Sequence, residues 1–89
     1  MDNITFKECV SNADAAFSNS RYEAALEWYQ KALQENADDL HCLSRAGAIC
    51  VMFKKFDEAL QHFEKAVSVD PANGDNYFNL GNAYFFCGK

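Results

Sequence analysis

The sequence predicts an all-α fold built from repeated helix pairs. Apolar residues recur at spacings of three and four along most of the 89 residues, which is the period of a helix with one buried face. Many of these positions recur again at one fixed, longer interval, so that Ala25 is followed by Ala59 and Gly47 by Gly81. A constant interval of this length that contains two helical runs indicates a stack of similar helix pairs.

The clearest unit lies between Leu40 and Pro71. It contains one apolar run over residues 40–51 and a second over 56–67, separated by a short polar break. Proline cannot continue a helix interior and disfavours helical dihedrals in the residue before it, so we expect the second run to end just before Pro71. The unit is therefore predicted to be two helices of about 14 residues joined by a tight turn.

Helix-capping signals predict where the first two helices begin. Thr5 and Glu8 have the spacing of a capping box, in which each side chain accepts from the backbone N–H of the other residue, so the first helix should start at Thr5. Ser20 and Glu23 repeat that spacing. They are expected to open a second helix over residues 20–35.

Acidic side chains predict the starts of later helices. Asp38 or Asp39 should cap the third helix, because a negative group accepts from the free N–H groups at a helix start. The fourth helix should begin near Phe56. After a turn that contains proline and glycine, the fifth should run from Asp75 to about Cys87.

Small residues mark the places where helices are expected to approach most closely. Gly47 should lie against Ala59, and Ala13 against Ala25, while larger apolar residues fill the space between them. Together these signals predict five helices in one domain, that is two complete pairs and half of a third.

The repeat resembles the tetratricopeptide repeat, a family in which a pair of helices recurs about every 34 residues. The residues that match its signature in the second and third units are Gly47, Ala59, Phe63, Ala66, Pro71, Tyr77, Leu80, Gly81, Tyr84 and Gly88. The first unit departs from the pattern: Ala13 replaces the glycine, Asn12 stands where a leucine is usual, and Ala37 replaces the proline.

The resemblance implies a fold and a class of function for the whole chain, residues 1–89. It implies a right-handed α-solenoid of antiparallel helix pairs, with repeats at about 6–39 and 40–73 and a half repeat at 74–89. It also implies a module that binds a protein or peptide, as a scaffold or as part of one. Such repeats seldom carry out chemistry.

Composition limits the kinds of partner. The net charge of −5 disfavours nucleic-acid binding, because proteins that contact phosphates carry a basic face. No apolar run approaches the roughly 20 residues that span a bilayer. The start Met1-Asp2-Asn3 lacks the basic and hydrophobic regions of a secretion signal. We therefore expect a cytoplasmic protein without nucleic-acid or membrane contacts.

Residues that could carry chemistry do not form a recognisable motif. The four cysteines are Cys9, Cys42, Cys50 and Cys87. They fall on or beside apolar stripes without the closely spaced pair that structural zinc sites use, so we expect them to pack in the core; a disulfide or a metal site is the alternative. His41 and His62 fall on different helices, and the chain has no glycine-rich phosphate loop. We expect no enzyme activity, metal or cofactor.

The resemblance implies that the first helices of successive pairs line a concave groove. The groove residues would be Lys7, Val10, Asp14, Phe17, His41, Ser44, Ala48, Val51, Met52, Asp75, Phe78, Asn82 and Phe85. Phe17, Val51, Met52 and Phe85 would form a pocket for hydrophobic side chains of a partner. For Phe17 and Phe85, packing between adjacent helices is the alternative.

Some members of the family hold the carboxyl terminus of heat-shock chaperones in a clamp of lysines, asparagines and an arginine. The corresponding residues here are Val10, Asp14, Arg45, Asp75 and Asn79. Two of them are acidic and one is apolar. We therefore expect no carboxylate clamp in this chain.

The fifth helix indicates an alternative function, self-assembly. It has no following helix, and the aromatic stretch Tyr84-Phe85-Phe86 is typical of a contact surface. We expect four of its residues to pack back onto the second unit: Asn76, Leu80, Ala83 and Cys87. A homodimer, formed where a sixth helix would lie, would use Tyr77, Gly81, Tyr84, Phe85 and Phe86. Either two copies associate there or a longer chain continues into the missing helix.

Overall fold

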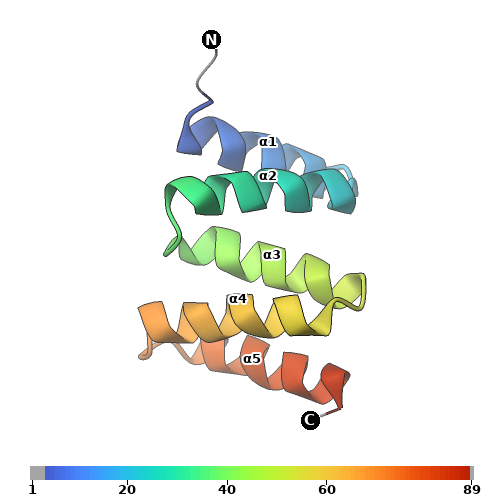
Figure 1. Cartoon of the computed structure of the whole chain (residues 1–89), viewed down its shortest axis with the longest axis vertical. Coiled ribbons are helices and arrows are strands. Elements are labelled where there is room, and N and C mark those ends of the chain that lie inside the picture. Colours follow the sequence, from blue (N-terminus) through green and yellow to red (C-terminus); the bar gives the residue numbers. More distant parts are fainter. Residues whose placement is uncertain (1–3, 89) are drawn as a thin grey trace.

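The computed structural model describes residues 4–88, and this range contains five α-helices and no strand. The helices are α1 (Phe6–Ser18), α2 (Tyr22–Glu35), α3 (Leu40–Met52), α4 (Phe56–Val69) and α5 (Gly74–Cys87). They stack in chain order with alternating direction, and the two ends of the chain lie at opposite ends of the stack (Figure 1). The predicted all-α solenoid of antiparallel helices is confirmed.

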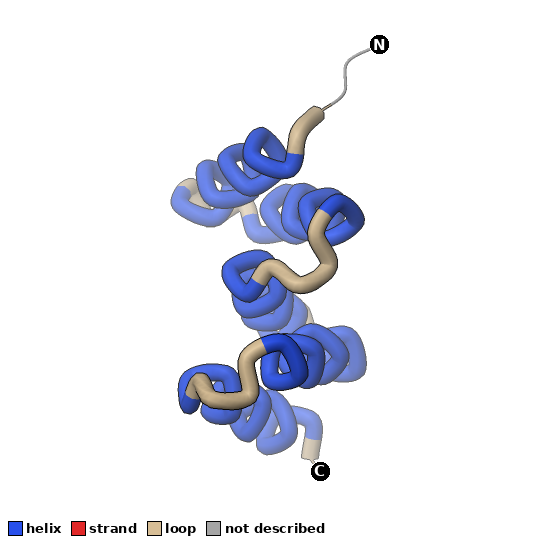
Figure 2. The backbone as a smooth tube through the Cα atoms, turned by 90° about the vertical axis from the view of Figure 1, so that its left-hand side faces the viewer, coloured by secondary structure: helices blue, strands red, loops and turns tan. Residues whose placement is uncertain are grey.

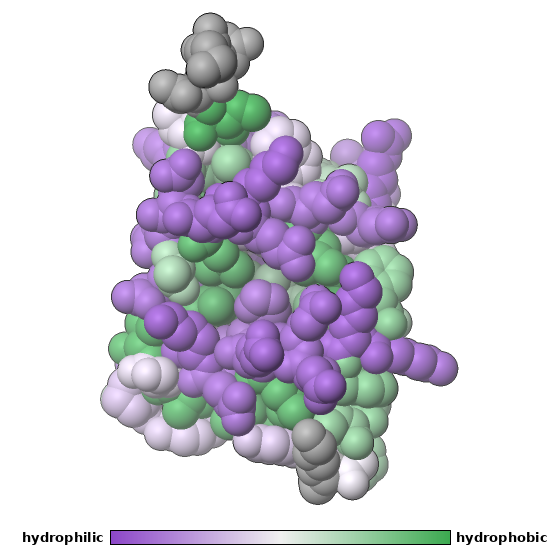
Figure 3. Space-filling view, viewed as in Figure 1, coloured by the Kyte–Doolittle hydropathy of each residue, from purple (hydrophilic) through white to green (hydrophobic). Residues whose placement is uncertain are grey.

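The helices form two layers. Figure 2 shows α1, α3 and α5 along one side of the stack and α2 and α4 along the other. Each helix packs mainly on its neighbours in the sequence, and α3 also contacts α5 directly. Figure 3 shows the molecule in the view of Figure 1, with α2 and α4 in front, and this face is mostly hydrophilic.

Two of the predicted helix caps are present. The N–H of Glu8 donates to Thr5 Oγ1 at 3.1 Å and the N–H of Thr5 donates to Glu8 Oε1 at 3.2 Å, so the capping box that starts α1 is confirmed. Asp39 caps α3, because its carboxylate accepts from the N–H of Cys42 at 3.0 Å. Each cap satisfies N–H groups that the helix itself leaves without a partner.

The predicted capping box at Ser20 is wrong. Ser20 has a φ of 60°, and α2 begins only at Tyr22 without a side-chain cap. Lys54, at the equivalent position one repeat later in the turn before α4, has the same φ. In both turns a left-handed residue ends the first helix of the pair and reverses the chain, which a capping geometry at that residue would not allow.

The core lies between the two layers and contains the small residues of the repeat. Ala13, Ala25 and Ala59 are fully buried. The ring of Phe63 also lies against Gly47: a Cβ built on Gly47 would lie 2.6 Å from two ring atoms. The missing side chain therefore makes room for an aromatic ring about one turn further along α4.

The cysteines follow the sequence-based expectation. Cys9, Cys42 and Cys50 are buried in the apolar core, and Cys87 is half-buried against it. Burial raises the pKa of Cys42 to about 12 and that of Cys50 to about 11; hydrogen bonding to Asp39 adds to the first shift and the charge of Glu58 to the second. Both thiols therefore stay protonated at neutral pH.

One side of α5 packs back onto the second repeat, as predicted. Ala83 is fully buried, and Leu80 is half-buried against the core. Asn76 is 4% exposed, and its amide donates to the carbonyl oxygens of Ala66 at 3.2 Å and Asp70 at 3.3 Å. These two bonds satisfy carbonyl groups at the end of α4.

Tyr84 differs from the expectation. The repeat pattern points it toward a sixth helix, but its ring packs partly against the core and its hydroxyl donates to Glu64 Oε2 on α4 at 2.9 Å. Tyr84 therefore lies at the edge of the face that a sixth helix would cover. The physical reason is the carboxylate on the neighbouring helix, which gives the hydroxyl a partner that the repeat pattern does not reveal.

Candidate binding surface

Two hollows lie along the side of the stack formed by α1, α3 and α5. The first, between α1 and α3, has a volume of about 490 Å³ and is lined by Phe6, Lys7, Val10, Ser11, Asp14, Asp39 and His41. The second, between α3 and α5, has a volume of about 180 Å³ and is lined by Ala48, Val51, Phe63, Asn79, Asn82, Ala83 and Phe86. We call them the α1–α3 hollow and the α3–α5 hollow.

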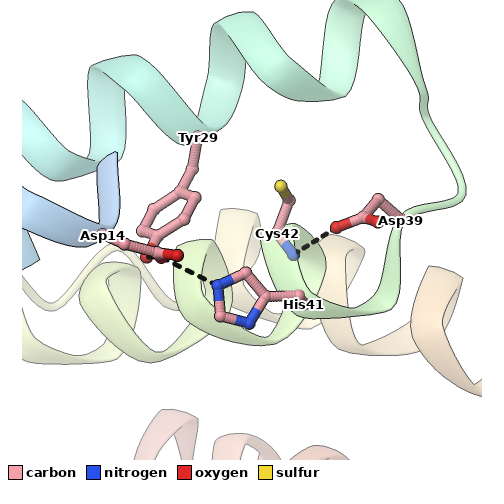
Figure 4. A network of polar contacts seen from close by, with 5 residues as sticks. All are labelled: Asp14, Tyr29, Asp39, His41 and Cys42. Carbon is pink, nitrogen blue, oxygen red and sulfur yellow. Dashed lines mark hydrogen bonds and ion pairs between the residues drawn. The ribbon is translucent and has the colours of Figure 1, made fainter. Parts of the chain in front are cut away.

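A hydrogen-bonded network fixes one wall of the α1–α3 hollow (Figure 4). Asp14 on α1 accepts a hydrogen bond from the hydroxyl of Tyr29 on α2, and Nε2 of His41 on α3 lies 2.8 Å from the same carboxylate oxygen. Tyr29 is fully buried, and its ring meets that of His41 edge to face, with centroids 5.9 Å apart. Three helices therefore hold one carboxylate at the surface of the hollow.

The network keeps Asp14 ionised at neutral pH. Partial burial acts to raise the pKa of this carboxyl group, but hydrogen bonds from Tyr29 and His41 and the nearby charges of His41 and Arg45 together lower the pKa below its usual 3.8. Burial and the adjacent carboxylate in turn raise the pKa of Tyr29, so its hydroxyl remains a donor. The hollow thus presents a fixed anion beside the exposed Lys7.

The α3–α5 hollow has a different character. Its lining is apolar apart from Asn79 and Asn82 on α5. An amide side chain can both donate and accept, as a peptide backbone requires. The rings of Phe63 and Phe86 provide apolar surface beside these amides. An extended segment could place an apolar side chain here and its backbone against the amides.

Seven of the predicted groove residues line the two hollows. Lys7, Val10, Asp14 and His41 belong to the α1–α3 hollow, and Ala48, Val51 and Asn82 to the α3–α5 hollow. Phe86, which the sequence assigns to a self-association surface, also lines the α3–α5 hollow. The remaining predicted residues lie outside both: Phe17, Ser44, Met52, Asp75, Phe78 and Phe85.

Phe17 has a packing role in the structure. Its ring meets that of Tyr22 edge to face with centroids 5.4 Å apart, and the guanidinium carbon of Arg45 lies 4.1 Å from its centroid. These contacts cover Phe17 from α2 and α3. Of the predicted pocket residues Phe17, Val51, Met52 and Phe85, only Val51 lines either hollow, while Met52 and Phe85 are exposed.

Six lining residues were not predicted: Phe6, Ser11, Asp39, Phe63, Asn79 and Ala83. Ser11 lies one turn after Lys7, so helical spacing could have identified it. The sequence marks Asp39 only as a cap. Phe63 lies on α4, the second helix of its pair, and was missed because the prediction assumed that only the first helices line the groove.

Within residues 4–88 the structure contains no group of three or more histidine, cysteine or acidic side chains that could hold a metal ion. Among the described helices, none combines the length and apolar character that crossing a membrane requires.

Comparison with known proteins agrees with the fold. A family model described as "TPR repeat" matches residues 53–86. A second, described as "Anaphase-promoting complex, cyclosome, subunit 3", matches residues 7–66.

Three curated proteins are similar to this chain in sequence. "Heat shock protein STI1" of Saccharomyces cerevisiae is 30% identical over 86 residues, which cover 96% of this chain and 15% of that protein. "Small glutamine-rich tetratricopeptide repeat-containing protein 2" of Mycosarcoma maydis is 30% identical over 83 residues, covering 93% and 24%. "Anaphase-promoting complex subunit 7" of Arabidopsis thaliana is 32% identical over 59 residues, covering 66% and 11%. The chain thus spans less than a quarter of each relative.

Two solved structures share the fold. The MamA protein superposes with a TM-score of 0.88 at 23% identity, over 98% of this chain and 48% of MamA. The TPR domain of Arabidopsis OM64 superposes with a TM-score of 0.80 at 22% identity, over 89% of this chain and 65% of that domain. The repeat spacing, the stacked helix pairs and these matches together show that the chain belongs to the tetratricopeptide-repeat family and is a protein-interaction repeat module.

Proposed function

We propose that the side formed by α1, α3 and α5 binds a peptide or helical segment of a partner protein without catalysing a reaction. The observation that carries the proposal is the presence of two hollows on this side, one between α1 and α3 and one between α3 and α5. Together they offer a fixed charge at one end and apolar surface with amides at the other. The net charge of −5 favours a protein partner over a nucleic acid.

The arrangement supports binding of an internal segment rather than a free carboxyl terminus. The relatives include a protein named heat shock protein STI1, and some family members hold chaperone carboxyl termini with a cationic clamp. Here Asp14 occupies one of the clamp positions as an anion held by Tyr29 and His41, and Arg45 lies over the ring of Phe17. A terminal carboxylate would therefore meet a negative charge where the clamp needs a donor.

A displayed peptide library selected on the purified chain tests this proposal. Enriched peptides are synthesised with a fluorophore and titrated by anisotropy against the wild type, Lys7→Ala in the α1–α3 hollow and Asn82→Ala in the α3–α5 hollow. Both side chains are exposed, so both variants should fold. At least one should weaken binding by about tenfold, which corresponds to about 1.4 kcal/mol.

A matched control and a second comparison sharpen the test. Glu27→Ala changes an exposed residue on α2, on the opposite side, and should leave the affinity unchanged. Peptides with a free and an amidated carboxyl terminus should bind equally. Affinity that depends on Glu27 and not on Lys7 or Asn82 would disprove groove binding, and a strong preference for the free terminus would disprove the internal-segment mode.

The exposed rings on α5 favour self-association as a second candidate. Phe85 is 79% exposed, Phe86 is 57% exposed and Tyr77 is 49% exposed. Apolar patches of this kind are often interaction sites. Light scattering across a concentration series tests this candidate: a mass that rises toward twice the monomer and falls back in Phe85→Ala would support it, and a monomer at every concentration would dismiss it.

A further inference from the structure

The α1–α3 hollow has a carboxylate at its surface that other helices hold through one oxygen only (Figure 4). Oδ1 of Asp14 accepts from the hydroxyl of Tyr29 and also lies 2.8 Å from Nε2 of His41. Within residues 4–88, Asp14 Oδ2 accepts no hydrogen bond, and the side chain of Asp14 is 45% exposed. The fold thus positions a carboxylate oxygen where a partner can reach it.

Asp14 forms no ion pair with a lysine or arginine among the described residues. The charge of Arg45 lies close enough to lower the pKa of Asp14, but its guanidinium carbon lies 4.1 Å from the centroid of the Phe17 ring. Lys7 stands two turns before Asp14 in α1, about 10 Å along the helix axis. At about 0.1 M salt the Debye length is also about 10 Å, so Lys7 opposes a cation at Asp14 only weakly.

The rest of the hollow suits both the stem and the charge of a basic side chain. Phe6 and Val10 are half-buried against the core and offer apolar surface to methylene groups. Asp39, the cap of α3, adds a second carboxylate to the lining, so that two carboxylates face the one ammonium group of Lys7. The volume of about 490 Å³ falls in the range of sites that hold small ligands, so a long side chain can enter.

We propose that the α1–α3 hollow binds an arginine or lysine side chain of the partner segment, with its charged group on Oδ2 of Asp14. The inference rests on the proposed groove function and adds the chemistry that the partner must carry. The methylene groups would lie along Phe6 and Val10, and charge complementarity selects the basic side chain. A carboxylate clamp would hold an anion here, so the two modes predict opposite charges on the partner.

The peptides that the displayed library enriches on the wild type are the probes. They should carry arginine or lysine at one recurring position. Citrulline in place of that arginine, or acetyl-lysine in place of that lysine, removes the charge and retains most of the shape. Anisotropy titrations at about pH 8, where an imidazole ordinarily carries no charge, should show that this neutral replacement weakens binding to the wild type by about tenfold or more.

Protein variants test whether the basic residue lies in the hollow, after circular dichroism has verified their fold. Asp14→Asn removes the charge but keeps an amide oxygen that can accept from Tyr29, so the neutral replacement should cost less than about threefold in this variant. Asp39→Asn keeps an acceptor that can cap α3 and should reduce the cost of the replacement about threefold. Glu27→Gln makes the same change in net charge at an exposed residue of α2 and is the matched control; it should leave that cost unchanged.

Three results would overturn the proposal and leave groove binding intact. The first is a set of groove-binding peptides that share no basic residue. The second is a cost of the neutral replacement that is unchanged in Asp14→Asn and Asp39→Asn, or that disappears in Glu27→Gln. The third is a recurring acidic residue whose neutralisation weakens binding to the wild type but not to Lys7→Ala, since the hollow would then bind an anion. Affinity that depends on Glu27, or failure to enrich any peptide, would instead overturn the proposed function itself.

Discussion

Replacing Gly47 with alanine perturbs a close contact between α3 and the Phe63 ring of α4. The added Cβ would lie 2.6 Å from Cε1 and Cζ of Phe63 and 3.0 Å from Cε2. Non-bonded carbons prefer about 3.5–4.0 Å, so the ring would have to move by about 1 Å. Phe63 is only 4% exposed, and such a movement would disturb the packing between α3, α4 and α5.

Gly81 provides the matched control for the size of this effect. Overpacking typically costs about 1–3 kcal/mol, while alanine in place of glycine in a helix interior gains about 1 kcal/mol. Gly47→Ala should therefore lower the free energy of unfolding by up to about 2 kcal/mol. Gly81→Ala, at the same position of the next repeat with nothing within 4 Å, should raise it by about 1 kcal/mol. The difference between the variants isolates the steric cost.

Urea unfolding followed by far-ultraviolet circular dichroism measures both free energies. Thermal scans provide a second measurement, since 1 kcal/mol shifts the melting temperature of a domain of this size by roughly 4–8 °C. Phe63→Leu should cost less in the Gly47→Ala background than in the wild type, because it removes the clash. Equal stabilisation by Gly47→Ala and Gly81→Ala would refute the proposed ring contact.

Three further predictions concern buried polar and titratable groups. Asn76→Asp places carboxylate oxygens against two backbone carbonyls at the end of α4. It should lower the free energy of unfolding by about 1–3 kcal/mol or more at neutral pH, and part of this loss should be recovered when acid protonates the carboxylate. An unchanged free energy in urea titrations would contradict the buried amide contacts. In the folded protein only the half-buried Cys87 should react quickly with a disulfide reagent at neutral pH, since burial raises the pKa of Cys42 to about 12 and of Cys50 to about 11; rapid reaction of several thiols would contradict the core assignment. In the folded protein the pKa of Asp14 is below 3.8, so its charge stabilises the fold above about pH 4, and this stabilisation is lost as the pH falls through the folded-state pKa. The difference in unfolding free energy between the wild type and Asp14→Asn should therefore narrow in acid. A difference that stays constant with pH would argue against the network.

Local patterns in the sequence are sufficient to predict the helical architecture. The three- and four-residue spacing of apolar residues produces helices with one buried face, and the constant repeat interval requires the pairs to recur. Local signals also predicted the cap of α1 at Thr5, a cap of α3 at Asp38 or Asp39 and the start of α4 near Phe56; the structure places the α3 cap at Asp39. The helix caps and starts depend on residues within about one helical turn of each other, so they can be predicted from short stretches of sequence.

Contacts between side chains on different helices are established only by the folded structure. Asp14, Tyr29 and His41 lie on three different helices and come together only because α1, α2 and α3 converge. The hydroxyl of Tyr84 likewise reaches Glu64 on the preceding helix, and this turns its ring toward α4. Side-chain rotation and helix crossing set such contacts, and neither is encoded in the repeat interval.

The same division explains the error at the turn and, of the two roles left open for Phe17, its packing between helices. Ser20 has the spacing of a cap, but closure of the helix pair imposes a left-handed conformation on it. Phe17 has the position of a groove residue, but Arg45 and Tyr22 cover its ring. Periodicity specifies the face of the helix on which a side chain lies. Whether that side chain remains open to a partner depends on the size and direction of its neighbours on other helices, and only the folded chain establishes both.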